Sequence, residues 1–319
     1  MIDADEAELV RASMRRLLGE ALPAEIPARL LNVGWTELLE TDPSTAVNEL
    51  GNAQGRGLIA APSLDLVLMH GASIALDGIT AFVLPNMQRR PAPPSRIVED
   101  VLIVDGLVLA GWDRAERYLV PCQDGIRSVT AAALAFAPVL GADPGLGLAR
   151  AAGEIGIGAA PRVSGSSVWE RAESLGRRFV AAELLGVVGR MLDETVSYVM
   201  ARHQFGRPIA SFQSVKHRLA DVRVALSAGE GALDAAWADD DPMSAMAAKC
   251  LAGRAHRVAA TNCHQVHGGI AFTVEHGFHR MIRRGQLLDG LLGASDDLVA
   301  TIGGQLLRSG LVPRRPALR

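Results

Sequence analysis

The sequence of 319 residues contains little of what marks several classes of protein. Its three cysteines, Cys122, Cys250 and Cys263, lie far apart and have neither a metal-binding nor a redox spacing. Aromatic residues make up only 4% of the chain although 49% is apolar, and this balance favours packed helices over a sheet sandwich. The net charge of −3 leaves no basic excess for nucleic acid. These absences exclude a disulfide scaffold and a polyanion-binding protein, and they predict buried thiols in a reducing compartment.

The sequence also lacks a segment suited to a membrane. The N-terminus is acidic and has no apolar signal core. The longest apolar stretch, residues 129–140, is interrupted by Pro138 and is shorter than the roughly 20 residues that a spanning helix needs. We therefore expect a soluble, cytoplasmic protein with neither a nucleic-acid nor a membrane partner.

The period of the apolar residues divides the chain into three parts. Residues 1–77 predict short amphipathic helices, one or two within residues 4–32 and another from Trp35 to Leu50. Residues 78–165 predict a small β domain, because short β-rich runs alternate there with proline and glycine. Residues 166–319 return to a helical period and predict an antiparallel bundle of long helices. The expected fold class is mainly α with a small β domain.

Turn and cap residues refine this division. Asp105-Gly106 lies between two apolar runs and predicts a β-hairpin. The first bundle helix is predicted to end before Gly206, and the second to begin with Ser211 as its N-cap. Gly268-Gly269 predicts the end of the third helix. The third, fourth and fifth helices are predicted at Pro242–Val266, Val274–Leu292 and Ser295–Leu307.

Two motifs at predicted helix ends carry a family resemblance. The first is RHQFGRPIASFQ, residues 202–213, which closes one helix and opens the next. The second is QVHGGIAFT, residues 265–273, again at a helix end. Together they resemble the flavin-contacting corners of the acyl-CoA dehydrogenase family, and the resemblance covers the bundle, about half of the chain. It implies the acyl-CoA dehydrogenase fold, here with shortened N-terminal helices and a degenerate β domain.

In this family the corner is donated across a subunit interface to the FAD of a neighbour. Such a cofactor suits the residue types present, because a guanidinium pairs with pyrophosphate, amides meet polar ring edges, and glycines allow close backbone approach. Taken singly, these residues also fit a solvated helix end, a core aromatic and helix caps; their order and spacing favour the family. The FAD contacts that the resemblance implies are Arg202, Phe205, Phe212, Gln213, Gln265, Gly268 and Gly269.

The departures from the family pattern are equally specific. The β domain has neither the Thr-Glu-Pro-like turn nor the Gly-Ser-Asp run that holds a subunit's own flavin. The two positions at which the family places its catalytic glutamate hold Leu292 and Gly176. After Gln265, the family pattern has a glycine where Ala271 lies and an acidic residue where Arg284 lies. Arg177 matches an arginine that lies near CoA in the family, although an exposed arginine at a helix start is an equal alternative. The chain is therefore expected to lack a complete flavin site of its own.

Three other carboxylates are weaker candidates for a base. Asp289 lies near the first empty position, and Glu173 and Glu183 lie near the second. Asp289 on an otherwise apolar helix needs a partner if it is buried. We expect that partner to be Arg283 or Arg284.

No metal site is predicted. His264 and His267 have a spacing that could ligate a metal, but no third ligand accompanies them. Both are expected to be surface or interface histidines.

The leading hypothesis is a base-less subunit of a heteromeric, FAD-dependent acyl-CoA dehydrogenase. It would pair with a catalytically complete homologue in a heterotetramer and share FAD with it at the interface, and the complex would pass electrons to an electron-transfer flavoprotein or a similar acceptor. Such small subunits resemble those of actinobacterial α2β2 enzymes that desaturate steroid-derived CoA thioesters.

Two alternatives remain open at this stage. One is a self-sufficient homo-oligomeric enzyme that uses Asp289 or a glutamate of the first bundle helix, which predicts a yellow protein on its own. The other is a non-enzymatic assembly subunit, which predicts that Arg202→Ala leaves the flavin content of any complex unchanged.

Overall fold

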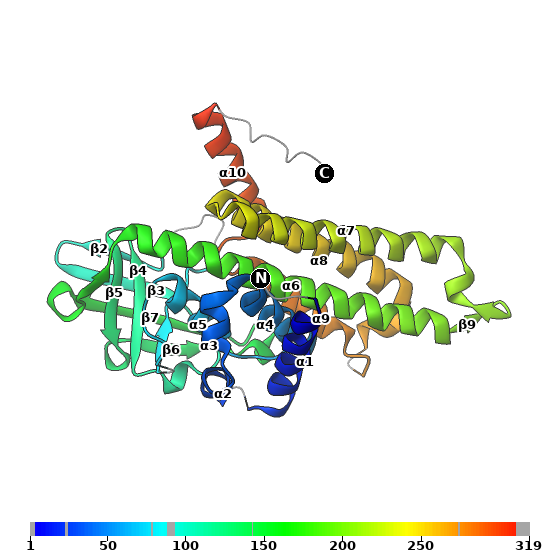
Figure 1. Cartoon of the computed structure of the whole chain (residues 1–319), viewed down its shortest axis with the longest axis horizontal. Helices are drawn as coiled ribbons and strands as arrows, with labels where there is room; N and C mark the ends of the chain where they lie inside the picture. Colours follow the sequence, from blue (N-terminus) through cyan, green and yellow to red (C-terminus); the bar gives the residue numbers. More distant parts are fainter. Residues whose placement is uncertain are drawn as a thin grey trace.

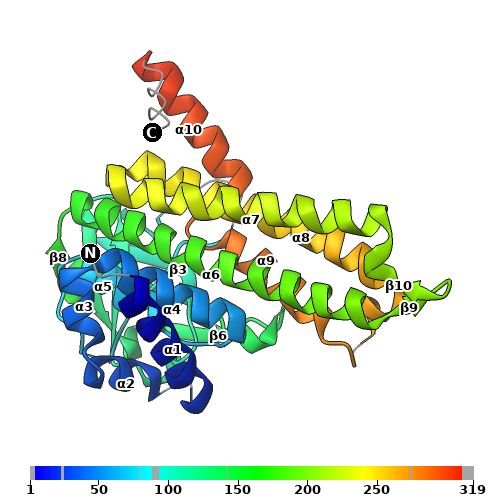
Figure 2. The same cartoon turned by 45° about the vertical axis from the view of Figure 1, so that its right-hand side comes forward.

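The chain is a helical bundle with a β domain at one end. The computed structural model describes residues 4–22, 25–77, 79–87, 93–141, 143–273 and 275–310. Figures 1 and 2 show two small sheets gathered at one end of three long helices, with short N-terminal helices along the side and helix α10 projecting away. A mainly α chain with a small β domain was predicted and is confirmed. Gly78 and Val274, where predicted segments begin, and residues 311–319 lie outside the described ranges.

The N-terminal part has more helices than predicted. The helix expected from Trp35 to Leu50 is two helices, because Asp42 (φ −141°, ψ 76°) ends the first and caps the second by accepting from the Thr45 N–H at 3.2 Å. The helix at Ser63–Gly71 was not predicted; it is buried on nearly all sides, so its sequence carries no amphipathic period. The five helices are α1 (Ala4–Glu20), α2 (Ile26–Asn32), α3 (Trp35–Thr41), α4 (Pro43–Gly57) and α5 (Ser63–Gly71).

Two four-stranded sheets form the β domain and pack around a shared apolar core. One sheet has the order β1-β4-β5-β8, with β1 and β4 parallel, and the other is antiparallel with the order β2-β3-β7-β6. Val83, Val104, Tyr118 and Val120 lie in the core between them. The strands are β1 (Thr80–Phe82), β2 (Ser95–Val98), β3 (Val101–Val108), β4 (Arg117–Cys122), β5 (Gly125–Thr130), β6 (Ala135–Pro138), β7 (Ala149–Gly156) and β8 (Arg162–Ser164).

The hairpin predicted at Asp105-Gly106 is wrong. Both residues lie inside the single strand β3, where they pair with Ala152 and Ala151 of β7. An added Cβ at Gly106 would stand 2.5 Å from the carbonyl oxygen of Leu84, so glycine serves here to let another backbone segment cross closely.

The bundle begins with the longest helix, α6. Every residue from Ser174 to Val188 is buried, which is expected for a helix surrounded by others. The second helix starts one residue later than predicted, because the Ser211 hydroxyl donates to the Pro208 carbonyl and Phe212 takes the N-cap position. The predicted end of the third helix at Gly268 is confirmed. The elements are α6 (Ser166–Ala201), β9 (His203–Gln204), β10 (Arg207–Pro208), α7 (Gln213–Asp239), α8 (Pro242–His267), α9 (Phe278–Gly290) and α10 (Ser295–Ser309).

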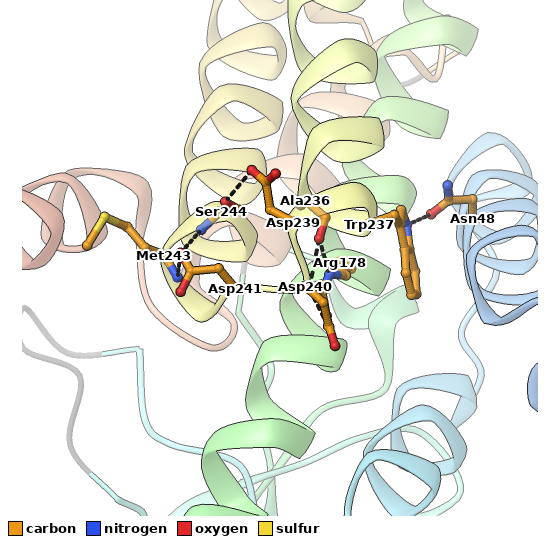
Figure 3. Close-up of polar contacts among 9 residues, drawn as sticks. All are labelled: Asn48, Arg178, Ala236, Trp237, Asp239, Asp240, Asp241, Met243 and Ser244. Atoms are coloured by element: carbon orange, nitrogen blue, oxygen red, sulfur yellow. Dashed lines mark hydrogen bonds and ion pairs between the residues drawn. The ribbon is translucent and has the colours of Figure 1, made fainter. Parts of the chain in front are cut away.

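A tight turn makes α7 and α8 antiparallel (Figure 3). Buried Arg178 of α6 donates to the carbonyl of Ala236 at 2.8 and 3.2 Å and pairs with Asp240 at 3.0 Å. The guanidinium thereby gives a hydrogen-bond donor to a backbone carbonyl in the last turn of α7, where no helical N–H is available. Asp241 then caps α8 by accepting from the N–H groups of Met243 and Ser244. Because the helices reverse here, the start of α7 and the end of α8 come together at the other end of the bundle.

One hydrophobic core joins the β domain to the helices. Leu84, Leu107 and Leu148 of the β domain belong to the same buried cluster as Leu64 and Leu68 of α5. Within the residues that the structure describes, no helix has the length and apolar character needed to cross a membrane. This buried cluster holds the sheets against the bundle.

Candidate functional site

The two sequence motifs meet at the end of the bundle opposite the sheets. The β9–β10 hairpin lies at this far end in both views (Figures 1 and 2), and α6 and α8 end beside it. Arg218 on the first turns of α7 donates to Asn262 on the last turns of α8 at 3.0 Å. The rings of Tyr198, near the end of α6, and His267, at the end of α8, lie 4.5 Å apart. We call this end, residues 202–213 and 265–273, the corner.

The hairpin presents an aromatic ring to solvent. Phe205 has a left-handed backbone (φ 53°) at the hairpin tip and is 90% exposed. Its ring meets that of Phe212 edge to face at 6.1 Å, and the guanidinium of Arg207 lies 4.3 Å from the centre of the Phe212 ring. Sequence reasoning missed Arg207, although it stands inside the first motif. The Phe212 ring is therefore already in contact with the guanidinium of Arg207, whereas the exposed Phe205 ring could contact another molecule.

The polar residues of the corner are exposed and have free hydrogen-bonding groups. Arg202 ends α6, Gln213 begins α7 and Gln265 lies near the end of α8. All three side chains are exposed, and none of them makes a hydrogen bond or ion pair with another residue that the structure describes. Exposed Phe272 from the second motif adds a further apolar surface at this end.

The glycine pair forms an open turn after α8. Gly268 has φ 66° and ψ −146°, a combination that is essentially restricted to glycine. A Cβ built at Gly268 or Gly269 meets no heavy atom within 4 Å, so the space beside the backbone of this turn is open. A free guanidinium, an open aromatic ring, two amides and bare backbone are the groups that one side of a bound dinucleotide requires. The corner therefore fits part of an FAD site.

Gly176 and Leu292, the two positions at which the family resemblance predicts a base, lie close together in space. Gly176 lies on α6 and Leu292 follows α9, yet a Cβ at Gly176 would stand 2.8 Å from Cδ1 of Leu292. It would also stand 2.8 Å from Leu68 and 3.3 Å from Leu64. Leu292 is fully buried. The space that a carboxylate side chain could occupy from either position is filled by leucine side chains.

Arg177 faces inward at the same point. It is buried, donates to the carbonyl of Leu292 at 3.0 Å and pairs with Glu173 at 2.9 Å. Burial raises the pKa of Glu173, and the charge of Arg177 opposes that rise. The alternative of an exposed helix-start arginine is wrong, and the guanidinium already has partners within this chain.

The backbone after α9 is held by a buried lysine. The Lys249 ammonium donates to the carbonyls of Asp289 and Gly293 at 2.7 and 2.6 Å, and burial lowers its pKa to about 8. The Asp289 carboxylate accepts from the Ser295 hydroxyl and pairs with Arg257 at 3.4 Å. The predicted ion pair of Asp289 with Arg283 or Arg284 is therefore wrong.

Arg284 instead joins the β domain to the bundle. It pairs with Asp143 at 2.5 Å and donates to the carbonyl of Ile59 at 3.1 Å. Nearby Glu183 is fully buried, and this burial raises its pKa to about 7 while Arg284 and Gln54 oppose the rise. Glu183 is therefore enclosed by protein in the single chain.

Cavities among the described residues lie elsewhere. One of about 620 Å³ lies among α1, α2 and α3, one of about 420 Å³ between the β domain and α9, one of about 370 Å³ between α1, α4, α6 and α7, and one of about 600 Å³ between α6 and α7. Neither Gly176 nor Leu292 lines any of these four. In the cavity between the β domain and α9, Arg150 and Asp105 form an ion pair, with Nε of Arg150 2.7 Å from a carboxylate oxygen of Asp105. These two charged groups therefore already have partners within the chain.

The two histidines of the second motif behave differently from expectation. His267 is buried at 4% exposure, so its assignment to the surface is wrong for the single chain. His264 is half-buried and packs edge to face on Phe272, with the ring centres 4.3 Å apart. Among the described residues no group of three or more His, Cys, Asp or Glu side chains is placed to hold a metal.

Comparison with known proteins identifies relatives of both the sequence and the fold. Residues 164–307 match the family model described as acyl-CoA dehydrogenase, C-terminal domain. The chain is 32% identical over 275 residues to acyl-CoA dehydrogenase IpdE2 of Mycobacterium tuberculosis, covering 85% of this chain and 80% of that protein.

Two solved structures share the whole architecture. A chain of the ChsE4–ChsE5 complex from Mycobacterium tuberculosis is 22% identical, with a TM-score of 0.74 over 98% of this chain and 99% of that one. A chain of the Tcur3481–Tcur3483 steroid ACAD G363A variant is 21% identical, with a TM-score of 0.79 over 96% and 99%. At these identities the structures establish the shared fold.

Proposed function

Because the chain belongs to the acyl-CoA dehydrogenase family, we propose that it serves as a base-free subunit of a heteromeric, FAD-dependent acyl-CoA dehydrogenase. Members of this family are FAD-dependent oxidoreductases that act on CH–CH bonds. The chain lends its corner to the FAD site of a catalytically complete homologue, and that partner supplies the carboxylate. The two chains together form a heterotetramer.

The observation that carries this proposal is a contrast between the two ends of the chain. At the corner, cofactor-type side chains are exposed and without partners among the described residues. At Gly176 and Leu292, where the family places its base, leucines fill the space. The corner also lies far from the chain's own sheets (Figure 1), so a flavin held against it belongs to another subunit's β domain.

The residues of the corner would each have a distinct task. When bound, FAD accepts the hydride that leaves the acyl β-carbon. Arg202 pairs with the cofactor's pyrophosphate, and Phe205 packs against the cofactor. Gln213 and Gln265 offer amides to its polar edges, while Gly268 and Gly269 let the backbone approach closely.

The substrate proposed for the complex is an acyl-CoA thioester, and a steroid-derived thioester is the first candidate to test. The names of two relatives support this choice, since one solved structure is called a steroid ACAD and both come from two-component complexes. Electrons leave the reduced flavin for an electron-transfer flavoprotein or a similar acceptor. The same proposal divides the chain into an N-terminal helical domain (residues 1–77), a β domain (78–165) and a helical bundle (166–319). The β domain is the part of this chain that has lost its own flavin-binding residues.

Flavin per chain, measured by absorbance, tests the proposal. The chain should be colourless alone and yellow when it is purified with a full-length homologue, with about one FAD for each pair of different chains. Full occupancy in the chain alone would contradict the donor role and favour a self-sufficient enzyme. Asp289→Asn would then be expected to abolish turnover.

Arg202→Ala isolates the donated contact. Loss of a charged hydrogen bond to pyrophosphate should cost about 1.5–3 kcal/mol, or roughly ten- to a hundredfold in FAD affinity of the complex. Arg16→Ala, at an exposed arginine of α1, is the control and should leave FAD affinity unchanged. Unchanged affinity in Arg202→Ala would instead support a subunit that serves assembly alone.

A further inference from the structure

A group of rings encloses the last residue of α8, directly before the glycine turn of the corner. The ring centre of His267 lies 4.5 Å from that of Tyr198 on α6 and 4.6 Å from that of Phe278 on α9. The ring of His276, in the turn before α9, lies 4.7 Å away. Together these rings leave His267 only 4% exposed. The position of this ring is therefore coupled to two other helices and to the chain that follows.

The enclosure offers no hydrogen bond to the His267 ring. Neither of its nitrogens has a partner among the described residues, and Nδ1 of His276 has none there either. Buried side-chain nitrogens are normally paired, and a second N–H on the ring would add one more donor without an acceptor. The surroundings of His267 therefore favour the neutral form of its ring over the protonated form.

The charges around His267 give no support to an imidazolium. Glu275 is exposed, and its carboxylate accepts from its own backbone N–H and from Thr273. Burial lowers the pKa of His267 to about 4, and two neighbouring histidines lower it further in the same direction. The titratable groups facing His267 from the elements packed on it are Tyr198 of α6, His264 of α8 and His276 of the turn before α9.

We propose that His267 is a positioning residue for the corner: its neutral ring, packed between α6 and α9, sets the place of Gly268 and Gly269. Uptake of a proton by that ring expels it from its apolar enclosure and moves the turn. The packing argument rests on this chain alone, and the consequence for FAD rests on the proposed function. Gly268 follows the ring directly in the chain, and its backbone conformation is strained for any residue other than glycine, so a displaced ring changes the position of this turn.

The sign of the pH dependence follows from the lowered pKa. The unfolded chain takes up a proton on His267 near pH 6.5, and the folded chain does so near pH 4. The ordered corner therefore has its full stability above pH 6.5 and loses it as the pH falls toward 4. At pH 5 the equilibrium between ordered and displaced turn should have shifted on the order of tenfold toward the displaced form.

Nuclear magnetic resonance on the chain alone, without flavin or partner, tests the positioning role. In the wild type, the ring signals of His267 should titrate well below pH 6.5, and the amide signals of Gly268 and Gly269 should change with the same midpoint. His267→Phe keeps an aromatic ring in place, and its glycine amides should lose that midpoint. His70→Phe, at a half-buried histidine of α5 whose pKa is also lowered, is the matched control and should retain it.

Two results would overturn the inference in this experiment. One is titration of wild-type His267 near 6.5, and the other is a pH response of the glycine amides that persists in His267→Phe. The wild-type titration decides the matter even if the variant fails to fold.

FAD dissociation from the complex at pH 7.5 and pH 5 provides the second test. The wild type should lose on the order of tenfold more affinity between these pH values than His267→Phe does. Equal losses would overturn the link between the ring and FAD. If Arg202→Ala shows that the corner makes no FAD contact, the proposed function fails, while the titration of the chain alone still decides whether His267 positions the turn.

Discussion

Replacing Gly176 by alanine tests whether the space at this predicted base position is filled by neighbouring side chains. An added Cβ would stand 2.8 Å from side-chain carbons of Leu292 and Leu68, closer than carbon atoms approach one another in proteins. Overpacking of a tight core costs about 1–3 kcal/mol. A glycine-to-alanine change inside a helix gains about 1 kcal/mol from backbone propensity. We therefore expect a net loss of about 0–2 kcal/mol in the free energy of unfolding.

A matched variant separates these two contributions. Gly231 also lies inside a long helix, α7, but a Cβ there meets no heavy atom within 4 Å. Gly231→Ala should stabilise the chain by about 0.5–1 kcal/mol. The difference between the two variants in urea unfolding, at equal m-values, should be about 1–3 kcal/mol and reports the steric cost alone.

A double mutant identifies the neighbour responsible. Leu292→Ala removes one of the two closest contacts, so Gly176→Ala should cost less in that background than in the wild type. If Gly176→Ala stabilises the chain as much as Gly231→Ala does, the space beside Gly176 is open. In that case the leucines do not exclude a carboxylate and a substrate from this half-site.

Two further substitutions have clear expected outcomes. Glu183 titrates near pH 7 in the folded chain and near 4.5 when unfolded, so its contribution to stability is present below pH 4.5 and is lost as the pH rises through 7. Glu183→Gln should therefore be more stable than the wild type by on the order of 2 kcal/mol at pH 8, with little gain at pH 4.5, and equal pH profiles of unfolding would refute this. Gly268→Ala should cost about 1–3 kcal/mol, because φ 66° with ψ −146° is strained for any other residue. Gly269→Ala has no positive φ to strain and open space for its methyl group, so thermal unfolding should show a smaller effect.

Local sequence was sufficient to predict the corner. Gly206, Pro208 and Gly268 interrupt long apolar periods, and such interruptions act within a few residues, so helix ends could be assigned from the sequence alone. The motif residues lie on those ends, and their order carried the resemblance to the family. The mainly α class followed from the same periods.

Prediction failed where a residue's surroundings come from distant parts of the chain. Asp105-Gly106 has the composition of a turn, but the crossing of Leu84 and pairing with β7 make it the interior of a strand. Asp289 pairs with Arg257 on α8 rather than with the arginines near it in sequence. In each case tertiary contacts outweighed a local preference of about 1 kcal/mol.

The sequence by itself determined which residue types lie at the corner and that the two positions predicted for a base hold glycine and leucine. Only the tertiary structure decided that Gly176 and Leu292 occupy the same point, that leucines fill it, and that His267 is enclosed by rings from other elements. The physical reason is that caps and turns depend on neighbouring backbone, whereas packing and desolvation depend on which helices come together.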